Sequence, residues 1–376
     1  MAFVGQLKQN GVLSSLYNMI IGQEVFSDNI ELKGTLFEKF RVDGTLYGDT
    51  KLFISTDVGK VRDFPDASGT LLTKRNPDNP FVQGVTIDTF KQAAITVDTV
   101  KLKQAFQTAD IYGAFVAVSV NWLREAYKVL NITLINTYVG TTVSAAVNAE
   151  IEVSLPEEPE TSIVEKQAHN SFLAELIGAK IADVSVDLED ALRDYNDLGY
   201  LRSYSLDKFI LVWNKRWANK IKHISLPKIF HKDEVIGKEL ESITINSRYF
   251  GTPIADAIAD GTTNRTLEDV IVKVNPSTGV YSSTGSEKQF FAGDILPQGT
   301  PSGTVPMYVE DATIICKLVH EKSIPFMSAL LVGTEFYNPK DLDRSHYLTW
   351  GYSKPQYLKE FPLLTFKADV DEVVAP

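Results

Sequence analysis

Cysteine is nearly absent from this sequence, and its scarcity restricts the chemistry that the chain can perform. Cys316 is the only cysteine in 376 residues, which excludes an internal disulfide bond and a zinc site made of cysteine ligands. It lies in the apolar run Ala312–Val319, which predicts a strand in which the thiol packs as a small hydrophobic group. No candidate base is near it in the sequence, so a nucleophilic or redox role is not favoured.

Long apolar runs and known catalytic motifs are absent as well. No run of about 18 apolar residues occurs, because the densest stretch, residues 324–336, is interrupted by Pro325, Ser328 and Gly333. The sequence therefore predicts no membrane span, and residues 1–21 lack the uninterrupted apolar core of a signal peptide. The G-x-S-x-G, H-E-x-x-H and G-x-G-x-x-G patterns do not occur. We therefore expect no catalytic residues, no cofactor-binding residues and no metal ligands.

Three groups of residues resemble chemical sites, but each has a simpler explanation. His223 and His231, with Asp233 and Glu234, lack the helical spacing of a metal-ligand pair, which favours a solvated loop. The stretch Gly299–Thr304 lacks the lysine of a phosphate-binding loop, so it predicts a turn. An acidic cluster lacks the glycine and closing glutamate of a calcium loop and suits the first turn of a helix. This cluster consists of Asp187, Glu189, Asp190, Asp194 and Asp197.

The charge of the chain is mainly negative. The formal net charge is −11, which does not favour a dedicated nucleic-acid-binding protein. The most basic stretch runs from Lys215 to Lys228 and includes Trp217. Three interpretations of it stay open: an ordinary lysine-rich helix face, a nucleic-acid contact, or a contact between subunits with the acidic segment Pro156–Glu160.

The first 100 residues are predicted to form an arm followed by a β-ribbon with loops. Residues 1–35 have too few periodic apolar positions for a core of their own. The proline-rich segment Asp63–Pro80 suits a solvent-facing loop or a projecting ribbon. The expected strands around it are Leu36–Val42, Thr45–Tyr47 and Leu52–Ser55, with Val85–Phe90 and Ala94–Val100 forming a returning strand.

A long helix is the clearest element of the sequence. Apolar residues recur three and four positions apart from Val116 to Tyr138, which predicts a helix over Asp110–Tyr138. At 1.5 Å per residue such a helix is about 40 Å long, whereas an average helix has about three turns. Gly140 is predicted to cap it, and Thr141–Leu155 to form a pair of strands. A long helix after a long ribbon indicates a building block rather than a catalyst.

In the second half of the chain, predicted helices and strands alternate as in an α/β lobe, and further strands follow. We expect a helix over Ile163–Val184 with His169 on its solvent-facing side, and an acidic helical stretch over Val186–Tyr195. A buried strand, Lys208–Trp213, precedes Asn214, which is placed to cap a helix beginning at Lys215. Turns and short strands alternate over residues 227–306. Further strands are expected at Ala312–Val319, Met327–Val332, His346–Tyr352 and Leu363–Lys367.

This order of elements resembles the tailed-phage major capsid proteins of the Hong Kong 97 type. Leu188–Asn196 followed by Phe209–Lys220 is similar to the helix, turn, buried strand and capped helix of that family's axial domain. Phe250–Ile254 resembles the short strand that follows them. Gly333–Lys340 together with His346–Tyr352 resembles the carboxyl-terminal part of some members.

The resemblance implies an α+β fold of the Hong Kong 97-like kind with four parts. They are an N-terminal arm at residues 1–31, an extended β-loop at 32–90, a peripheral domain and an axial α/β domain. The peripheral domain would comprise residues 91–160 and 307–376, including the spine helix at 110–138. The axial domain would comprise residues 161–306.

The same resemblance implies a structural role and not an enzyme. The chain would be the major capsid protein of the virion, assembled in the host cytoplasm into an icosahedral shell around a double-stranded DNA genome. Its partners would be other copies of itself in pentamers and hexamers, with portal, scaffolding and head-decoration proteins. Packaged DNA would be bound only non-specifically, and no membrane would be involved. Two alternatives stay open: an α/β enzyme of unknown reaction, and another structural protein such as an encapsulin or a tail component.

Overall fold

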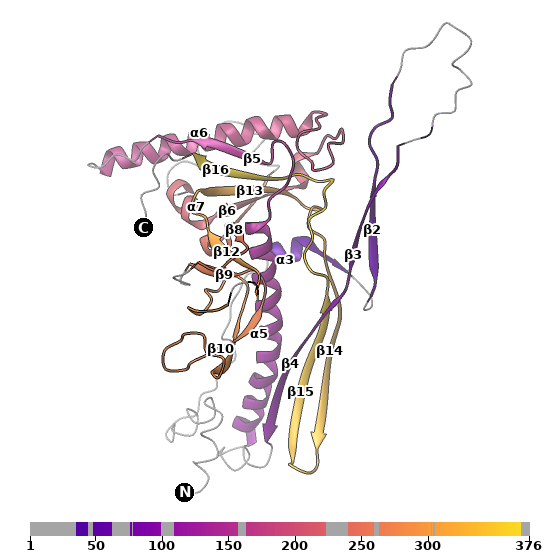
Figure 1. The fold of residues 1–376 in the computed structure, drawn as a ribbon, viewed down its shortest axis with the longest axis vertical. Helices are drawn as coiled ribbons and strands as arrows, with labels where there is room; N and C mark the ends of the chain where they lie inside the picture. The colour runs from indigo at the N-terminus through magenta and orange to yellow at the C-terminus, as the bar shows by residue number, and fades with distance from the viewer. Residues whose placement is uncertain are drawn as a thin grey trace.

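A computed structural model describes residues 35–43, 48–61, 76, 78–98, 109–156, 163–222, 240–258, 263–301, 303 and 305–369. A single long helix, α5 (Ala109–Thr141), runs through the middle of the molecule (Figure 1). A five-stranded sheet and the helix α6 (Ile163–Glu189) lie at its upper end in that view. A four-stranded sheet lies along one side of α5, and smaller sheets lie on the other.

The helix α5 confirms the prediction of a long spine. Its 33 residues include the whole of the predicted range 110–138, which corresponds to about 50 Å at 1.5 Å per residue. Leu123, Leu130 and Leu134 are buried at the spacing of seven and four that a single packing face requires. Tyr127 meets the indole of Trp350 edge to face, with ring centroids 5.2 Å apart. The spine is therefore held by the sheet beside it.

The end of α5 differs from its prediction. Gly140 was expected as a cap, but it lies inside the helix, which continues to Thr141. Of the expected strand pair over Thr141–Leu155, the structure has one strand, β5 (Glu150–Ser154). The backbone of η2 (Ser247–Tyr249) crosses the helix so closely at residue 140 that a Cβ atom there would overlap the carbonyl oxygen of Tyr249. Glycine is needed here for close approach, and not for a turn.

The five-stranded sheet forms the main core, in the order β5-β16-β13-β6-β7. In the interior strand β6, between β13 and β7, every residue is buried. Leu211 and Trp213 face the cluster beneath α6 and α7, whereas Ile210 and Val212 face the cluster around α5. A strand covered on both faces is apolar throughout, and this explains the continuous run in the sequence. The remaining elements are η1 (Leu206–Lys208), β6 (Phe209–Asn214), α7 (Lys215–Lys222), β7 (Glu241–Ile245), β13 (Ile314–His320) and β16 (Leu363–Asp369).

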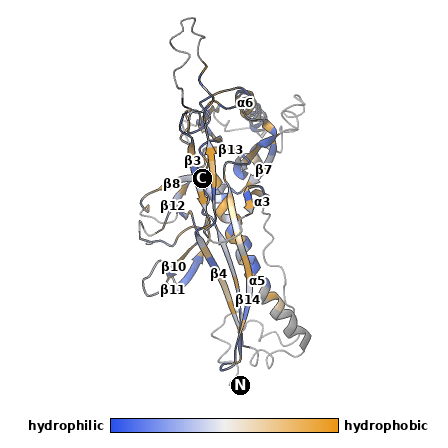
Figure 2. Cartoon of the chain, turned by 90° about the vertical axis from the view of Figure 1, so that its right-hand side faces the viewer, coloured by the Kyte–Doolittle hydropathy of each residue, from blue (hydrophilic) through white to orange (hydrophobic). Residues whose placement is uncertain are grey.

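The elements of this lobe that the sequence predicted are confirmed, with one exception. Asn214 is buried and its side-chain oxygen accepts a hydrogen bond of 3.0 Å from the N–H of Arg216, as a helix cap does. Cys316 packs in β13 opposite Trp213, and β13 is strongly apolar in Figure 2. The acidic stretch Val186–Tyr195 does not form a helix of its own. Its first part is the last turn of α6, and the chain then bends after Glu189.

The four-stranded sheet has the order β1-β14-β15-β4. It combines β1 (Arg41–Asp43), β4 (Thr89–Asp98), β14 (Phe326–Asn338) and β15 (Asp343–Tyr352). The predicted strands at Met327–Val332 and His346–Tyr352 are confirmed, and both are longer than predicted because they form a continuous hairpin. The hairpin and β4 extend far down the side of α5.

Two predictions in the first hundred residues are wrong. Leu36–Val42 is mostly a short helix, α3 (Thr35–Phe40), because Leu36 and Phe40 are four positions apart and both are buried on the α5 cluster. The returning strand is two strands, since β3 (Phe81–Thr86) pairs with β2 (Thr50–Ser55) whereas β4 pairs with β15. The predicted strand at Leu52–Ser55 is confirmed, and Thr45–Tyr47 lies outside the described residues.

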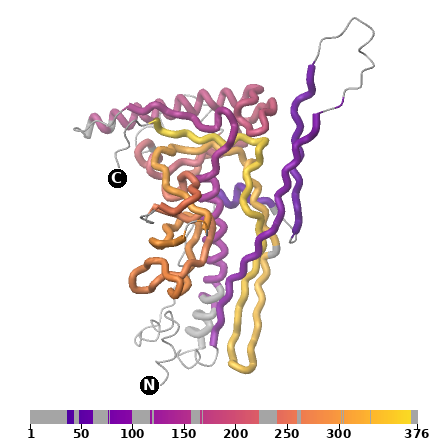
Figure 3. The backbone as a smooth tube through the Cα atoms, in the orientation of Figure 1, coloured from indigo at the N-terminus to yellow at the C-terminus, as the bar shows by residue number. Residues whose placement is uncertain are grey.

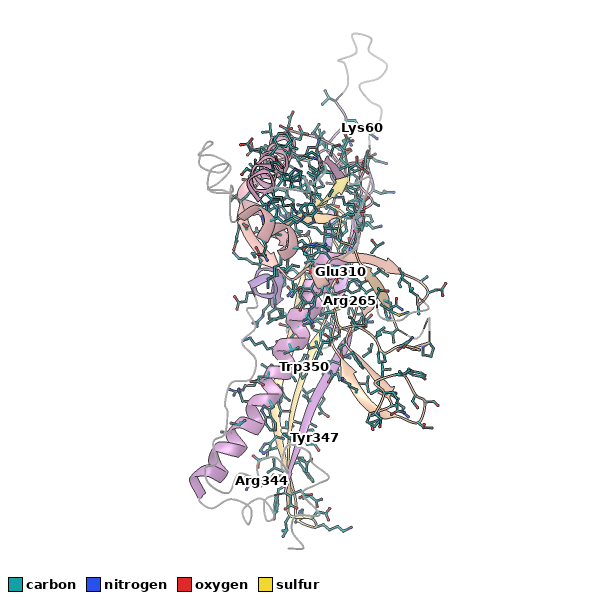
Figure 4. All side chains as sticks on the ribbon, turned by 90° about the vertical axis from the view of Figure 1, so that its left-hand side faces the viewer. Lys60, Arg265, Glu310, Arg344, Tyr347 and Trp350 are labelled. Atoms are coloured by element: carbon teal, nitrogen blue, oxygen red, sulfur yellow. The ribbon has the colours of Figure 1, made fainter. Side chains whose placement is uncertain are left out.

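The region predicted as turns and short strands forms two small sheets. One has the order β8-β12-β9, and the other pairs β10 with β11. The guanidinium of Arg265 binds the carboxylate of Glu310 at 2.8 Å and ties β9 to β12, as Figure 4 shows. The strands are β8 (Gly251–Ile254), β9 (Asn264–Thr266), β10 (Val270–Val274), β11 (Ser286–Phe290) and β12 (Met307–Glu310).

The predicted domain ranges meet in the five-stranded sheet. Its strands β6 and β7 come from the range expected for the axial domain, whereas β5, β13 and β16 come from the ranges expected for the peripheral domain. These strands are hydrogen-bonded to one another. The sheet is consequently a single unit built from distant parts of the chain.

Candidate assembly surfaces

The β2–β3 ribbon projects from the side of the molecule (Figure 3). Its inner side contributes Val85 and Phe53 to a small cluster with Met327 and Leu358. Its outer side leaves Leu52, Ile54 and Val82 between 49% and 63% exposed, and Ile54 lies directly opposite Val82. Adjacent exposed apolar side chains on a protruding element are typical of a contact surface.

The end of the paired ribbon that is nearest the loop tip is fixed by charged and polar contacts to the upper lobe, which contains α6 and the five-stranded sheet. Asp57, just after β2, accepts hydrogen bonds from the guanidinium of Arg193 at 2.7 Å and from the N–H of Leu201 at 3.0 Å. The guanidinium of Arg202 donates to the carbonyl of Thr56 at 2.6 Å and binds the carboxylate of Glu360. Contacts between residues 136 to 146 apart in the chain therefore set the direction of the ribbon.

The charge of Asp57 is strongly favoured. The hydrogen bond from Arg193, with those from the N–H groups of Leu201 and Val58, lowers the pKa of Asp57 to about 2 from the ordinary 3.8. The carboxylate is therefore ionised throughout the neutral and mildly acidic range. On β3, the side chain of Gln83 adds a second attachment by donating to the carbonyl of Tyr357 at 2.8 Å.

The predicted loop tip lies mostly outside the described residues. At its base, the ammonium of Lys60 and the carboxylate of Asp78 form an exposed ion pair of 3.0 Å that links the two sides of the ribbon. Figure 4 places Lys60 at the upper end of the molecule, towards the tip. A pair this exposed contributes little stability.

The lower, four-stranded sheet has an outer face that is neutral over most of its length, with Asp98 and Asp343 only at its far end. On β15, the residues of this face alternate with Trp350 and Leu348, which pack towards α5. The face includes Val332 and Phe336 of β14, Tyr347 and Thr349 of β15, and Gln92 and Ala94 of β4. Tyr347 and Trp350 lie along the sheet in Figure 4. A neutral face of this kind is a second candidate for contact with another protein.

The basic stretch is only partly described. Residues 215–222 form α7, with Ala218 and Ile221 buried, and residues 223–228 lie outside the described residues. The indole N–H of Trp217 donates to the carbonyl of Ala312 at 2.9 Å, and the Lys220 ammonium lies 5.4 Å from the centre of its ring. Trp217 is thus engaged with the core and with Lys220, which disfavours its use as a stacking platform for bases. The contact with Pro156–Glu160 stays a prediction, since residues 157–160 are not described.

The acidic cluster has structural roles. Asp187 accepts a hydrogen bond from the hydroxyl of Tyr195 at 2.9 Å, and Asp197 accepts one from the N–H of Ala145 at 3.0 Å. Asp187 and Glu189 lie in the last turn of α6 and not in a first turn as predicted. Within the described ranges, no group of three His, Cys, Asp or Glu side chains is arranged to hold a metal ion.

The structure describes the glycine-rich stretch in part but not the predicted histidine group. His223 and His231, with Asp233 and Glu234, lie outside the described residues. His169 is half-buried on α6. Gly299 has a φ of 82° and follows Pro297, whose carbonyl accepts a hydrogen bond from the N–H of Thr300, as expected of a turn.

Sequence reasoning missed a buried lysine. Lys317 of β13 is fully buried, and its ammonium donates to the carbonyl of Thr142, just after α5, at 2.7 Å. Burial, together with the charge of the nearby Lys367, lowers the pKa of Lys317 to about 7 from the ordinary 10.5. A lysine inside an otherwise apolar strand was the available signal. Its partner, 175 residues away, gave no local sign.

A cavity of about 380 Å³ lies between α5, β4, β8 and the segments that follow β9 and β15. Two lysines line it, and both are paired: Lys91 with Asp269 at 2.9 Å and Lys354 with Glu268 at 3.6 Å. Neither a histidine nor a cysteine is among its described lining residues.

No described helix is both long and apolar enough to span a membrane.

Solved structures share the fold of this chain. A chain from the capsid structure of Staphylococcus phage Andhra matches with a TM-score of 0.58 and 11% identity, covering 94% of this chain and 91% of that one. A chain from the structure of the head fibre and inner core protein gp22 of native bacteriophage P68 matches with a TM-score of 0.59 and 11% identity, covering 93% and 90%. A chain from the capsid of Cyanophage P-SCSP1u matches with a TM-score of 0.52 and 9% identity, covering 95% and 94%.

The comparison of sequences is decisive for the family. No curated protein matches this sequence. The family described as Phi29-like phage major capsid protein, however, matches residues 5–354, which is nearly the whole chain. The mixed α and β fold and the predicted kinship with tailed-phage capsid proteins are confirmed. The chain belongs to the family of Phi29-like phage major capsid proteins.

Proposed function

We propose that many copies of this chain self-assemble into an icosahedral shell that encloses a double-stranded DNA phage genome. The observation that carries the proposal is the β2–β3 ribbon. Contacts of Asp57 and Arg202 fix its end nearest the loop tip to the upper lobe, while Leu52, Ile54 and Val82 are exposed on its outer side. An element that is anchored at one end and apolar on its free side is suited to lie on another subunit.

The working parts follow the family arrangement. We keep the arm at residues 1–31 and the extended loop at 32–90 as proposals. The spine helix and the sheet of β4, β14 and β15 act as the peripheral domain, and the lobe of β6, α6 and α7 as the axial domain. Since β5, β13 and β16 are hydrogen-bonded with β6 and β7 in one sheet, they are counted with the axial lobe.

Assembly proceeds by geometry and not by catalysis. Identical chains occupy pentamers and hexamers, and the arm and loop absorb the differences between these positions. Many interfaces of modest size add up, because each contact that forms makes the next one intramolecular. Portal, scaffolding and head-decoration proteins are the further partners, packaged DNA is bound only non-specifically, and assembly takes place in the host cytoplasm.

Deleting the loop tip, Asp66–Asp78, tests this function. The parent chain, expressed with and without a scaffolding protein, should form large closed shells in negative-stain microscopy. The deletion should leave the subunit folded but reduce the yield or heat resistance of the shells. A substitution such as Lys180→Ala on the exposed side of α6 serves as the control and should leave the shells unchanged.

The outcomes separate the alternatives. Small discrete oligomers of the parent chain under both conditions would favour an enzyme. Shells that form without phage partners and enclose protein cargo would favour an encapsulin. Tubes in place of shells would favour a tail component. Unchanged shells after the deletion would contradict the proposed role of the extended loop.

A further inference from the structure

The strand β14 is an edge strand over most of its length. Strand β15 pairs along one side of it as far as Asn338. On the other side, β1 pairs with residues 326–328 and then ends. Among the described residues, no strand pairs with that side from Val332 to Asn338. Such an edge presents a row of backbone N–H and C=O groups that another strand can bind.

This edge lacks the features that keep soluble proteins from pairing at their edges. Leu331, Val332, Phe336 and Tyr337 are between 39% and 60% exposed. The only charged residue from 331 to 338 is Glu335, which binds the guanidinium of Arg344 on β15 at 2.9 Å. Lysine and proline, which commonly protect an edge, do not occur in this stretch. The irregularity in β14 lies between Ala329 and Val332, so the pairing with β15 is regular beyond it.

The sequence of the edge is complementary to itself in one antiparallel register. With Thr334 opposite Thr334, Val332 lies opposite Phe336 and Gly333 opposite Glu335. The apolar pair is of the kind that stabilises sheets, and the two carboxylates are not opposed. The pattern repeats on both sides of the centre, as a two-fold axis requires.

Neighbouring registers are less favourable. Centring the pair on residue 335 places two glutamates directly opposite each other, which destabilises a sheet. Centring it on residue 336 moves Val332 opposite Lys340, beyond the end of the strand. Both alternatives lose the contact between Val332 and Phe336.

We propose that β14 pairs antiparallel with β14 of a second copy of this chain, about a two-fold axis at Thr334. The two four-stranded sheets then form one continuous sheet, with their neutral outer faces on the same side. A strip of five to seven residues is far smaller than a stable interface of roughly 1,200 Å². The contact therefore rests on the proposed shell function, in which it adds to other contacts between the same subunits.

A cysteine cross-link tests the register directly. In the proposed pair the two Thr334 Cα atoms lie about 4.5–5.5 Å apart, within the range of a disulfide. Particles of Thr334→Cys should therefore give a disulfide-linked dimer under mild oxidation. Cys316 is buried, so it does not compete. Non-reducing electrophoresis and mass spectrometry of the linked peptide provide the measurement.

Tyr337→Cys is the matched control. It lies on the same strand with similar exposure, but in this register its two copies lie about 20 Å apart. It should give at most about one tenth of the dimer, since a disulfide needs Cα atoms within about 7 Å. Equal dimer from both variants would indicate random collision and would overturn the proposal. Particles of Thr334→Cys without dimer would overturn it as well.

A charge exchange keeps the test decisive if Thr334→Cys does not assemble. Phe336→Lys and Val332→Glu should each lower the yield of particles, and the double variant should restore it, because each lysine then faces a glutamate of the other copy. If the double variant does not restore the yield, or if the single variants assemble normally, the proposed pairing is wrong. If the parent chain forms normal particles but gives no sign of the β14 pairing, only this inference is wrong and the proposed shell function stands. If the parent chain forms no particles, the proposed shell function itself is contradicted.

Discussion

Gly140 and Lys317 are two residues whose roles depend on segments far away in the sequence. Gly140 lies where the backbone of Tyr249 crosses α5. Lys317 joins the central sheet to the end of the same helix through the carbonyl of Thr142. Both positions lie near one end of the spine. The packing of that end therefore depends on the absence of a side chain at Gly140 and on the buried amino group of Lys317.

Gly140→Ala should destabilise the protein by about 3 kcal/mol or more, the upper range for overpacked positions. The added methyl group would overlap the carbonyl oxygen and carbon of Tyr249, and backbone atoms move less readily than a side chain. Chemical denaturation of the isolated subunit measures the effect. Gly59→Ala is the control, because no atom lies within 4 Å of a Cβ there. Equal denaturation midpoints for the two variants would show that the backbone of η2 shifts to accommodate the added methyl group at little cost.

Lys317→Met should remove a dependence of stability on pH. In the folded protein the pKa of Lys317 is about 7, compared with 10.5 in the unfolded chain. Between these values the unfolded chain holds a proton that the folded protein has released, so the free energy of unfolding rises with pH from about 7 to 10.5. Methionine has no titratable proton, so the free energy of unfolding of Lys317→Met should change less with pH over this range.

Denaturant unfolding at several pH values measures this effect. Lys180→Met, on an exposed position of α6, is the control and should keep the slope of the parent. Parallel curves for the parent and Lys317→Met would mean that the lysine stays charged when buried.

The ribbon and the spine are the two elements whose position follows from identifiable contacts. The ribbon is fixed just beyond β2 by the ion pair of Asp57 with Arg193 and by the hydrogen bond from Arg202 to the carbonyl of Thr56, and the spine by apolar packing on two sheets. Ion pairs at a partly exposed site can open without unfolding the domain, whereas a buried apolar face cannot. We therefore expect the ribbon to respond to pH and the spine to respond only to changes in its packing.

Asp57→Asn should loosen the attachment of the ribbon to the upper lobe at neutral pH. The pKa of Asp57 in the folded protein is about 2 compared with the ordinary 3.8, so its stabilising effect is complete above about pH 4 and is lost as the pH falls towards 2. Hydrogen exchange of residues 50–60, corrected for intrinsic rates, should be faster in the variant, and the difference should disappear near pH 2. Asp78→Asn removes an exposed ion pair and serves as the control. A difference that persists at pH 2 would assign the effect to something other than the charge.

Leu130→Asp should prevent folding as well as assembly. Leu130 is 4% exposed in the cluster that joins α5 to both large sheets. An unpaired buried charge costs about 3–5 kcal/mol, which is a large part of the 5–15 kcal/mol that typically stabilises a domain. Lys128→Asp, on an exposed position of the same helix, should unfold near the parent midpoint. Cooperative unfolding of Leu130→Asp at that midpoint would contradict the packing of the spine.

As a phage major capsid protein, the chain is a structural component of the virion. Its described shape suits this role, because the ribbon and the lower hairpin project in different directions from a central body (Figure 1). The N-terminal arm lies outside the described residues. Its role in assembly stays a prediction from the sequence.

Removing residues 2–27 should lower the yield of particles or make them misshapen. The arm has apolar residues but too few of them for a core. The unfolding free energy of the isolated subunit should therefore stay within about 1–2 kcal/mol of the parent. Limited proteolysis read by mass spectrometry gives a second measurement, in which assembly should protect the arm. Equal cleavage in free and assembled protein would mean that the arm makes no contact in the shell.

Local patterns in the sequence were sufficient to identify most of the long elements. The helix α5 follows from apolar spacing, the buried strand β6 from a continuous apolar run, and the cap at Asn214 from its position before α7. These features depend on neighbours within a few residues. The short helix α3 was missed, because its two apolar positions fit a strand as well as a single helical turn until the α5 cluster buries both.

The arrangement of these elements depends on contacts that no local pattern contains. The pairing of β5 with β16, the division between β3 and β4, and the contacts of Asp57 with Arg193 and of Lys317 with Thr142 join residues that are far apart in the chain. The same is true of the free edge of β14, since an edge exists only once the order of the sheet is known. Propensity and capping act over a few residues, whereas strand order and buried polar pairing are settled when the whole chain packs.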